Sequence, residues 1–322
     1  AVQIALLNNP SLQATYGELR IADANLVQAG RLHNPGFSFK RLERDGAAVD
    51  IERQFLFDVL GLLTLPTRTE IETRRFEQTQ LRVTREVMQV AAETRRAWYA
   101  AVAAEQGVRY MEDVKDVADA GAELAKRMAA AGNWSKLDQS RQQVFHAETL
   151  AQLARTKQSA VTEREKLTRL MGLTGNDIRF QLPGRLPDLP KLARDQAGME
   201  NEAMAARLDI QMARKEVDGL AKSLGLTRAT RFVNVLEASY LRNSATGEPR
   251  QTGYEVGLSI PIFDSGDAKV ARAEAVYLQA VNRLSEIAVN ARSEVREAYA
   301  AYRTAFDLAQ HYRDEIVPLR KQ

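Results

Sequence analysis

The sequence of 322 residues has no cysteine, few prolines and glycines, and no long apolar run. The lack of cysteine excludes disulfides, thiolate metal sites and a cysteine nucleophile. Only nine prolines and 18 glycines interrupt a composition rich in Ala, Arg, Glu, Gln and Leu, which favours long helices. The most apolar segment, Val59 to Leu65, is far shorter than the roughly 20 residues that a membrane-spanning helix needs.

Charge of one sign is also lacking, because 45 basic and 42 acidic residues leave a net charge of +3 without a block of like charges. Such a mixed surface is not typical of a nucleic-acid partner. The three histidines, His33, His146 and His311, are isolated and show no metal-binding spacing. We therefore expect no catalytic site, no cofactor and no metal site, and a protein that is not an enzyme.

What the sequence does contain is an internal repeat. A shift of 201 places Glu93 on Glu294 and Trp98 on Tyr299, and a shift of 198 places Ala5 on Ala203. Self-similarity at a fixed spacing indicates a repeat architecture. The pattern predicts a mainly α fold with a β part, built from a duplicated unit of helix, β-hairpin and long helix.

The first repeat is expected over 1–197. Its strands alternate around the turn dipeptide Asp45-Gly46. We interpret Pro66 as the end of this β segment, since proline has no N–H to donate. In chain order we expect a helix over 1–32, strands over about 36–44 and 48–59, a long helix over about 67–131, a tip turn over 132–135, a return helix over about 136–172 and a connector over 173–197.

The second repeat is expected over 198–322, with Pro261 at its strand-to-helix change. The shift of 201 places Gln322 on Gly121, before the tip turn, so we expect this repeat to be C-terminally incomplete. The start at Ala1, in the middle of a helical pattern, likewise suggests that an upstream portion has been removed. The expected elements are a helix over 199–229, strands over about 231–241 and 253–263, and a long helix from about 266.

The long helix of the first repeat has a small-residue seam. From Val83 to Val108, positions three and four apart carry mostly Val and Ala, which predicts a coiled coil. At about 1.5 Å per residue the helix spans roughly 95 Å. Gly132 and Ser135 then supply a helix C-cap and an N-cap, so the long and return helices are expected to form an antiparallel hairpin with a protruding tip.

The four strands have the length of tilted transmembrane β-strands, about 10 residues each. One large apolar face beside a small or polar face is the pattern of a strand between lipid and a lumen. Four strands cannot close a barrel, but three protomers would supply 12. The alternative is a small soluble sheet that caps a helical bundle. The expected lipid-facing residues are Tyr254, Val256, Leu258, Ile260 and Ile262.

Three stretches resemble the TolC family of outer-membrane efflux channels: ALLNNPSLQA near the start, AAAGNWSKLDQSRQQVFHAE at the tip, and VGLSIPIFDSGDAKVARAEA around Pro261. The segment from Phe55 to Pro66 departs from the family pattern, because it lacks the FDSGD junction. The resemblance implies a homotrimer with a 12-stranded β-barrel in the outer membrane of a Gram-negative bacterium and an α-helical coiled-coil tunnel through the periplasm. The family's gate residues would lie beyond residue 322.

The resemblance also implies partners. The tunnel tip of the family docks onto a periplasmic adaptor protein and, through it, an inner-membrane pump. Capping explains Gly132 and Ser135 as well, and the two roles are compatible, whereas a large aromatic such as Trp134 at a tip is more typical of a contact. The expected adaptor-contacting residues are Gly132, Asn133, Trp134, Ser135, Leu137 and Asp138.

The expected function is therefore a passive conduit from the periplasm to the exterior, opened when adaptor and pump engage. The alternative function is a soluble periplasmic coiled-coil scaffold, or an adaptor-like protein, with a small β cap. Outer-membrane lipid is an expected partner of the conduit and not of the soluble scaffold.

Overall fold

The computed structural model describes two compact units of the chain. One, here the hairpin unit, comprises Ala1–Thr15, Arg85–Arg194 and Ala305–Gln322. The other, here the sheet unit, comprises Tyr16–Thr84 and Asp195–Thr304. The described residues are 1–43, 48–193, 195, 197–233 and 235–321.

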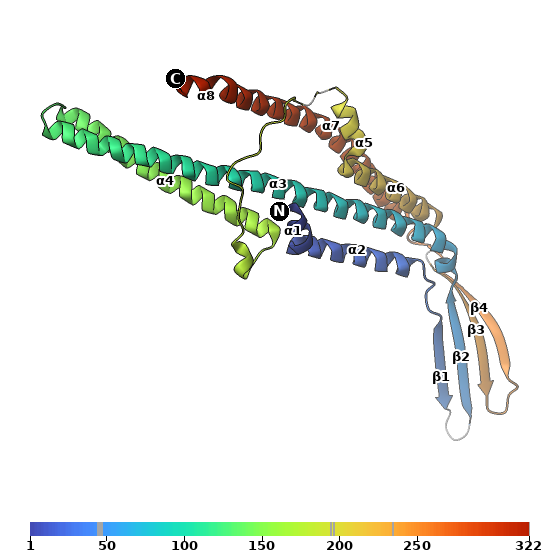
Figure 1. Cartoon of the computed structure of the whole chain (residues 1–322). Helices are drawn as coiled ribbons and strands as arrows, with labels where there is room; N and C mark the ends of the chain where they lie inside the picture. The colour runs from blue at the N-terminus through green and yellow to red at the C-terminus, as the bar shows by residue number, and fades with distance from the viewer. Residues whose placement is uncertain (44–47, 194, 196, 234, 322) are drawn as a thin grey trace. The chain divides into compact units, whose positions relative to one another are not determined.

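The sheet unit contains a four-stranded antiparallel sheet in the order β1-β2-β3-β4 (Figure 1). The first hairpin agrees closely with the predicted strands, and its predicted turn, Asp45-Gly46, lies outside the described residues. The second hairpin is displaced from the predicted ranges by up to five residues. The strands are β1 Gly36–Glu43, β2 Val49–Asp58, β3 Leu236–Ala245 and β4 Gln251–Leu258.

Alternation along the strands gives the sheet an aromatic face and a polar face. Directly paired residues share a face, so the register assigns every strand residue to one of the two. The aromatic face carries Phe37, Phe39, Arg41, Glu43, Val49, Ile51, Arg53, Phe55, Phe57, Leu236, Ala238, Tyr240, Arg242, Ser244, Thr252, Tyr254, Val256 and Leu258. The polar face carries the alternate residues, among them Lys40, Glu52, Gln54, Ser239 and Glu255.

Strand β4 ends earlier than predicted, so Ile260 and Ile262 lie beyond it, in the connection to the next helix. Two features explain the difference. The Ile262 N–H donates to the Ile260 carbonyl across Pro261, which closes a tight turn. Phe232, which the register would place opposite Ile262, lies in the turn after a helix and offers no strand to pair with. The prediction that Ile260 and Ile262 are strand residues is therefore wrong, whereas Pro261 does lie between strand and helix.

The first helix of each repeat is broken at equivalent positions, Asn9 and Arg207, which the shift of 198 superposes. Asn9 precedes Pro10, and its side-chain oxygen accepts from the N–H groups of Ser11 and Leu12 at 2.9 and 3.2 Å. Arg207 has no proline after it, and its guanidinium instead donates to both carboxylate oxygens of Asp209. The helices are α1 Val2–Asn8, α2 Pro10–Ala29, α5 Met199–Ala206 and α6 Leu208–Ala229.

Helix α3 runs over Val59–Ala130, 72 residues, and Pro66 lies inside it. The interpretation of Pro66 as a strand-to-helix junction, and of a helix that begins at 67, is wrong. The junction is Asp58, whose Oδ1 accepts from the Gly61 N–H at 2.7 Å, the geometry of an N-cap on the third helical residue. His33 contacts the other oxygen of Asp58 at 2.6 Å.

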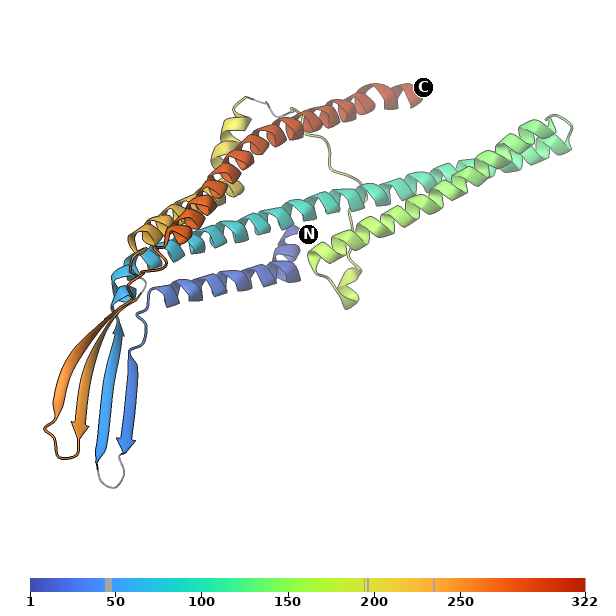
Figure 2. The same cartoon turned by 180° about the vertical axis from the view of Figure 1, so that it is seen from behind.

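In the hairpin unit, α3 and α4 Lys136–Met171 lie side by side as an antiparallel pair in both views (Figures 1 and 2). The predicted seam is buried here, with Ala97 and Ala101 only 1% exposed and Thr94 fully buried. The core at the base of the pair is formed by Ala5, Val90, Ala97, Ala101, Leu167 and Met171. Small seam residues therefore let α3 approach α4 and α1 closely, as the sequence predicted.

The remaining elements are short except for one. After α4, the described part of 173–197 contains a single 3-10 turn, η1 Gly175–Ile178, and no strand. The long helix of the second repeat is α7 Asp267–His311, followed by a π-helical turn η2 Tyr312–Ile316 and by α8 Val317–Lys321. Across the described residues, no helix combines the length and the apolar composition needed to cross a membrane.

Candidate functional site

The tip of the hairpin unit is a capped turn with exposed side chains. Gly132 adopts φ +74°, and the N–H groups of Gly132 and Asn133 bond to the carbonyls of Ala129 and Met128. This is the Schellman arrangement that closes a helix C-terminus. Ser135 accepts from the Asp138 N–H at 3.1 Å and donates to its carboxylate at 2.6 Å, which caps α4. The predicted caps are confirmed.

Two large apolar side chains of the tip take no part in the capping hydrogen bonds. Trp134 is 37% exposed and Leu137 is 60% exposed. Neither belongs to the core at the base of the hairpin. An aromatic and an aliphatic side chain that are both partly exposed at a hydrogen-bonded turn are typical of a contact surface.

Behind the tip, a charged cluster ties the two arms of the hairpin together. Asp119 on α3 accepts from Lys115 at 2.6 Å and contacts His146 on α4 at 2.6 Å. The hydrogen bond from Lys115, and then that with His146, holds the pKa of the Asp119 carboxyl below its usual range. Within this cluster, the contact with His146 is the one that joins α3 to α4. Sequence patterns could not predict it, because the two residues lie 27 positions apart.

We expect the stability of this hairpin to fall in acid. The folded pKa of Asp119 is lowered, so its ionised form contributes stability above the unfolded value of about 3.9, and this contribution is lost as pH falls through the folded value. Asp119→Asn should therefore lower the Tm of the hairpin at pH 7, and the difference from the wild type should shrink as the pH falls below the unfolded pKa of Asp119. Asp116→Asn is the matched control, because among the described residues Asp116 pairs with Lys115, at 3.4 Å, and makes no ion pair with α4. Equal effects of the two variants at pH 7 would contradict the role of Asp119.

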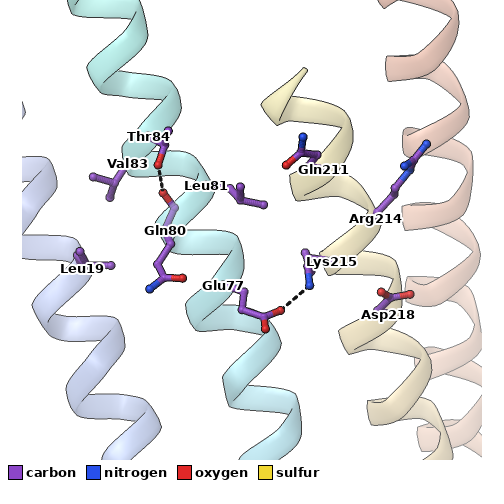
Figure 3. Close-up of a pocket in the computed structure, with 10 residues that line it drawn as sticks. All are labelled: Leu19, Glu77, Gln80, Leu81, Val83, Thr84, Gln211, Arg214, Lys215 and Asp218. Atoms are coloured by element: carbon purple, nitrogen blue, oxygen red, sulfur yellow. Dashed lines mark hydrogen bonds and ion pairs between the residues drawn. The ribbon is translucent and has the colours of Figure 1, made fainter. Parts of the chain in front are cut away.

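The sheet unit has an open groove of about 790 Å³ between α3 and α6 (Figure 3). Glu77 lies in it and accepts from Lys215 at 2.7 Å and from Arg74 at 2.9 Å. The Lys215 hydrogen bond is the chief reason that the pKa of Glu77 is lowered. The groove is therefore lined by paired charges, and these pairs join α6 to α3. Its lining is Leu19, Glu77, Gln80, Leu81, Val83, Thr84, Gln211, Arg214, Lys215 and Asp218.

Two repeated glutamates serve the same purpose in the sheet unit. Glu18 on α2 pairs with Arg82 of α3 at 2.7 Å, and Glu216 on α6 accepts from Gln78 of α3 at 3.3 Å. The shift of 198 superposes Glu18 and Glu216. The duplication thus places one helix of each repeat against α3 through an equivalent carboxylate.

The aromatic face of the sheet is uncovered in the described chain. Tyr254 is 87% exposed, and Phe37, Phe55 and Val256 are also exposed. Phe37 and Phe55 stack on each other with centroids 4.9 Å apart, and Tyr240 pairs with Tyr254 across β3 and β4. An exposed apolar patch of this extent marks an interaction surface rather than ordinary surface composition.

The described residues contain no group of three or more His, Asp or Glu side chains arranged to hold a metal ion. Each unit instead presents an exposed feature. The hairpin unit has a tip with exposed apolar side chains, and the sheet unit has a sheet with an uncovered aromatic face.

This combination has counterparts among known structures. The outer membrane channel CmeC of Campylobacter jejuni superposes with a TM-score of 0.81, covering 99% of this chain and 74% of that one at 16% sequence identity. The chain has the fold of the TolC-family outer-membrane channels. The outer membrane protein VceC of Vibrio cholerae shares this TolC-family fold, with a TM-score of 0.76, 17% identity, and coverage of 94% of this chain and 78% of that one.

Sequence comparison points to the same TolC-family fold. The cobalt-zinc-cadmium resistance protein CzcC of Cupriavidus metallidurans is 22% identical over 280 residues, which are 85% of this chain. The chain spans 65% of the length of that relative. No protein-family model matches the chain. The resemblance predicted from the three sequence stretches is confirmed at the level of the fold.

Proposed function

We propose that this protein is the outer-membrane channel of a tripartite efflux system, a passive conduit from the periplasm to the exterior and not an enzyme. The observation that carries the proposal is the sheet. One of its faces is uncovered and aromatic, and its two edge strands, β1 and β4, present backbone groups that could pair with each other between protomers. The TolC-family fold, and the exposed tip of a long helical hairpin, support it.

Backbone hydrogen bonds alternate along each strand, so they determine which N–H and C=O groups point outward at the two edges of the sheet. Val235 accepts from the Ser259 N–H, so in the β3–β4 pair the odd-numbered residues of β4 bond to β3. The N–H and C=O groups of the even-numbered residues therefore point outward. On β4 these outward-bonding residues are Thr252, Tyr254, Val256 and Leu258.

The other edge follows from the same alternation. Val49 accepts from the Thr246 N–H, so the odd-numbered residues of β2 bond to β3 and the even-numbered ones bond to β1. On β1, the even-numbered residues consequently bond to β2. The outward-bonding residues of β1 are Phe37, Phe39, Arg41 and Glu43.

These two edges are complementary. Both sets of outward-bonding residues have their side chains on the aromatic face, so β4 of one protomer can pair with β1 of the next without turning either face over. Each strand runs opposite to its neighbour, so in a protomer with four strands β4 runs opposite to β1. The pairing of β4 with the β1 of the next protomer would therefore be antiparallel. Open edges are not tolerated in lipid, which favours a closed ring, and three protomers would give a barrel of 12 strands.

We assign the aromatic face to lipid and the polar face to the lumen. Tyr254, Val256 and Leu258 are then lipid-facing strand residues, while Ile260 and Ile262 would continue the apolar surface just beyond the strand. On the polar face, carboxylates outnumber basic side chains, and such a lumen favours cations. The name of the Cupriavidus relative refers to cobalt, zinc and cadmium, and we propose cationic cargo for this chain as well.

We also assign adaptor contact to the tip, through Gly132, Asn133, Trp134, Ser135, Leu137 and Asp138. Gly132 and Ser135 would shape the turn, while Trp134 and Leu137 would supply the apolar contact. The inner-membrane pump would engage through the adaptor. This division predicts that contact can be removed without damage to the fold.

The test is a paired substitution at the tip. We expect W134A/L137A to be recovered from the outer membrane as a trimer, yet to lose cross-linking to the adaptor and most efflux in a deletion strain, since apolar anchors dominate small interfaces. Leu150→Ala is the matched control, because Leu150 is an exposed leucine on the same helix away from the tip. Undiminished efflux in the tip variant would contradict the adaptor contact. A monomeric protein in the soluble fraction would contradict the channel and favour the coiled-coil scaffold.

A further inference from the structure

Two arginines interrupt the aromatic face at one level. The register places Arg53 of β2 directly opposite Arg242 of β3. The same row continues with Phe39 on one side and Thr252 on the other. Because Arg53 and Arg242 exchange both ladder hydrogen bonds, their Cα atoms lie only about 5.5 Å apart.

Neither guanidinium has a carboxylate partner among the described residues. The ion pairs nearest in the sheet join Arg41 to Glu43 at 3.6 Å on the same face, and Lys40 to Glu52 at 3.4 Å on the polar face. The Arg53 guanidinium lies over the ring of Phe39, 5.9 Å from its centroid. Like charges directly opposite each other destabilise a sheet, so an anion that bridges the two guanidiniums would relieve this repulsion.

The position of the pair indicates where that anion would be. The row next to it on the helix side is Phe37, Phe55, Tyr240 and Tyr254, followed by rows that contain Val256 and Leu258. Tyrosines at the border of an apolar band are typical of a membrane interface. On the other side, the described strand residues of this face are Arg41, Ile51, Ser244, Glu43 and Val49. The arginines therefore stand at the hairpin-side limit of the apolar band.

An arginine in the middle of the hydrocarbon layer is costly, and the cost falls steeply towards the headgroups. The headgroup level supplies the anion that two adjacent guanidiniums match best, since a planar fork of N–H donors binds phosphate oxygens in bidentate fashion. The hairpins face away from the helices of the sheet unit (Figure 2), so the level in question belongs to the leaflet remote from the periplasm.

We propose that Arg53 and Arg242 of each protomer bind the phosphate of a phosphorylated glycolipid in the outer leaflet. The site rests on the proposed function, because it requires the aromatic face to contact lipid. Phe39 holds one guanidinium against the sheet, Tyr240 and Tyr254 lie beneath at the acyl boundary, and the lipid phosphate relieves the repulsion between the two arginines.

The test uses the detergent-extracted protein and its thermal stability as lipid is added. The probes are lipid A with its phosphates, the same lipid after enzymatic removal of the phosphates, and inorganic phosphate alone. We expect wild-type protein to bind phosphorylated lipid A roughly tenfold more tightly than the dephosphorylated lipid. R53Q/R242Q should lose that preference, and inorganic phosphate should not raise the Tm.

Lys40→Gln is the matched control, since it removes one positive charge from the opposite face of the same sheet. It should keep the full preference. The comparison of the two lipids needs only wild-type protein, so it decides the matter even where R53Q/R242Q fails to assemble. Equal binding of the two lipids, an unchanged preference in R53Q/R242Q, or stabilisation by inorganic phosphate alone would each overturn the site. Failure to recover a trimer from outer membranes would instead contradict the channel itself.

Discussion

Replacing Val256 with proline is expected to weaken the proposed trimer about a hundredfold while each protomer keeps its helices. The Val256 N–H points away from β3, towards the edge at which a neighbouring β1 would pair. Proline has no N–H, and its fixed φ is tolerated on an edge strand. The variant should therefore fold as a protomer but associate poorly with its neighbours.

The size of the effect follows from the symmetry. Closure of the proposed ring of three protomers would use the Val256 N–H three times. Each hydrogen bond contributes about 0.5–1.5 kcal/mol in water, and more where lipid surrounds the unpaired group. A total of about 3 kcal/mol corresponds to a weakening of trimer association by roughly a hundredfold. Size-exclusion chromatography in detergent measures the trimer, and far-UV circular dichroism measures the helices.

Two variants control for the loss of the side chain and for the choice of edge. Val256→Ala keeps the N–H and should remain trimeric. Glu255→Pro removes an N–H that bonds to β3 within the protomer, so it should disturb the sheet as well as the trimer. Persistence of a stable trimer in the Val256→Pro protein would show that β4 does not form the closing edge.

The second large effect is expected from Gly172→Ala, at the end of α4. Gly172 has φ +64°, and a Cβ there would lie 2.4 Å from the carbonyl oxygen of Asn8. The left-handed backbone costs about 1 kcal/mol or more for alanine. The clash with backbone adds about 1–3 kcal/mol, because α1 must move. We expect a loss of about 2–4 kcal/mol in the free energy of unfolding of the hairpin unit.

The clash is also expected to disturb a hydrogen bond between the α1–α2 junction and the end of α4. Asn9 donates to the Leu170 carbonyl at 2.9 Å, while its oxygen caps α2. Displacement of α1 should therefore expose amides of α1 and of the start of α2 to hydrogen exchange.

Gly132→Ala provides the matched control for backbone strain. Gly132 has a similar φ of +74°, but a Cβ there would meet nothing within 4 Å. Chemical denaturation should show Gly172→Ala to be clearly the more destabilising of the two. Equal losses would mean that the contact with Asn8 does not constrain the hairpin unit.

The caps and helix lengths of the hairpin unit could be predicted because they depend on neighbouring residues. Gly132 and Ser135 act within four residues of their own positions, and the small-residue seam through Ala97 and Ala101 follows the helical period. The strand-to-helix junction of the first repeat was mispredicted for an equally local reason. Asp58 caps α3 directly, whereas the predicted boundary, Pro66, lies eight residues further along and inside the helix.

The second hairpin could not be placed from the period of two alone. Tyr254, Val256 and Leu258 share the predicted face, but the alternation continues through Ile260 and Ile262 without a strand to pair with. The end of β4 depends on where its partner β3 begins, which in turn depends on where α6 ends. The alternation of residues within β4 contains no information about either point. The contact of Asp119 with His146 was missed in the same way, since it depends on the register of two helices.

The sequence by itself determined the duplication, the long helices, the capped tip and the membership of an apolar face, because each depends on spacing along one segment. Only the tertiary structure decided which backbone groups lie on the open strand edges, that Arg53 and Arg242 stand side by side, and that Gly172 must have no side chain. These three facts depend on the register between segments that lie far apart in the chain. Hydrogen bonds and packing set that register jointly, after the local pattern has formed.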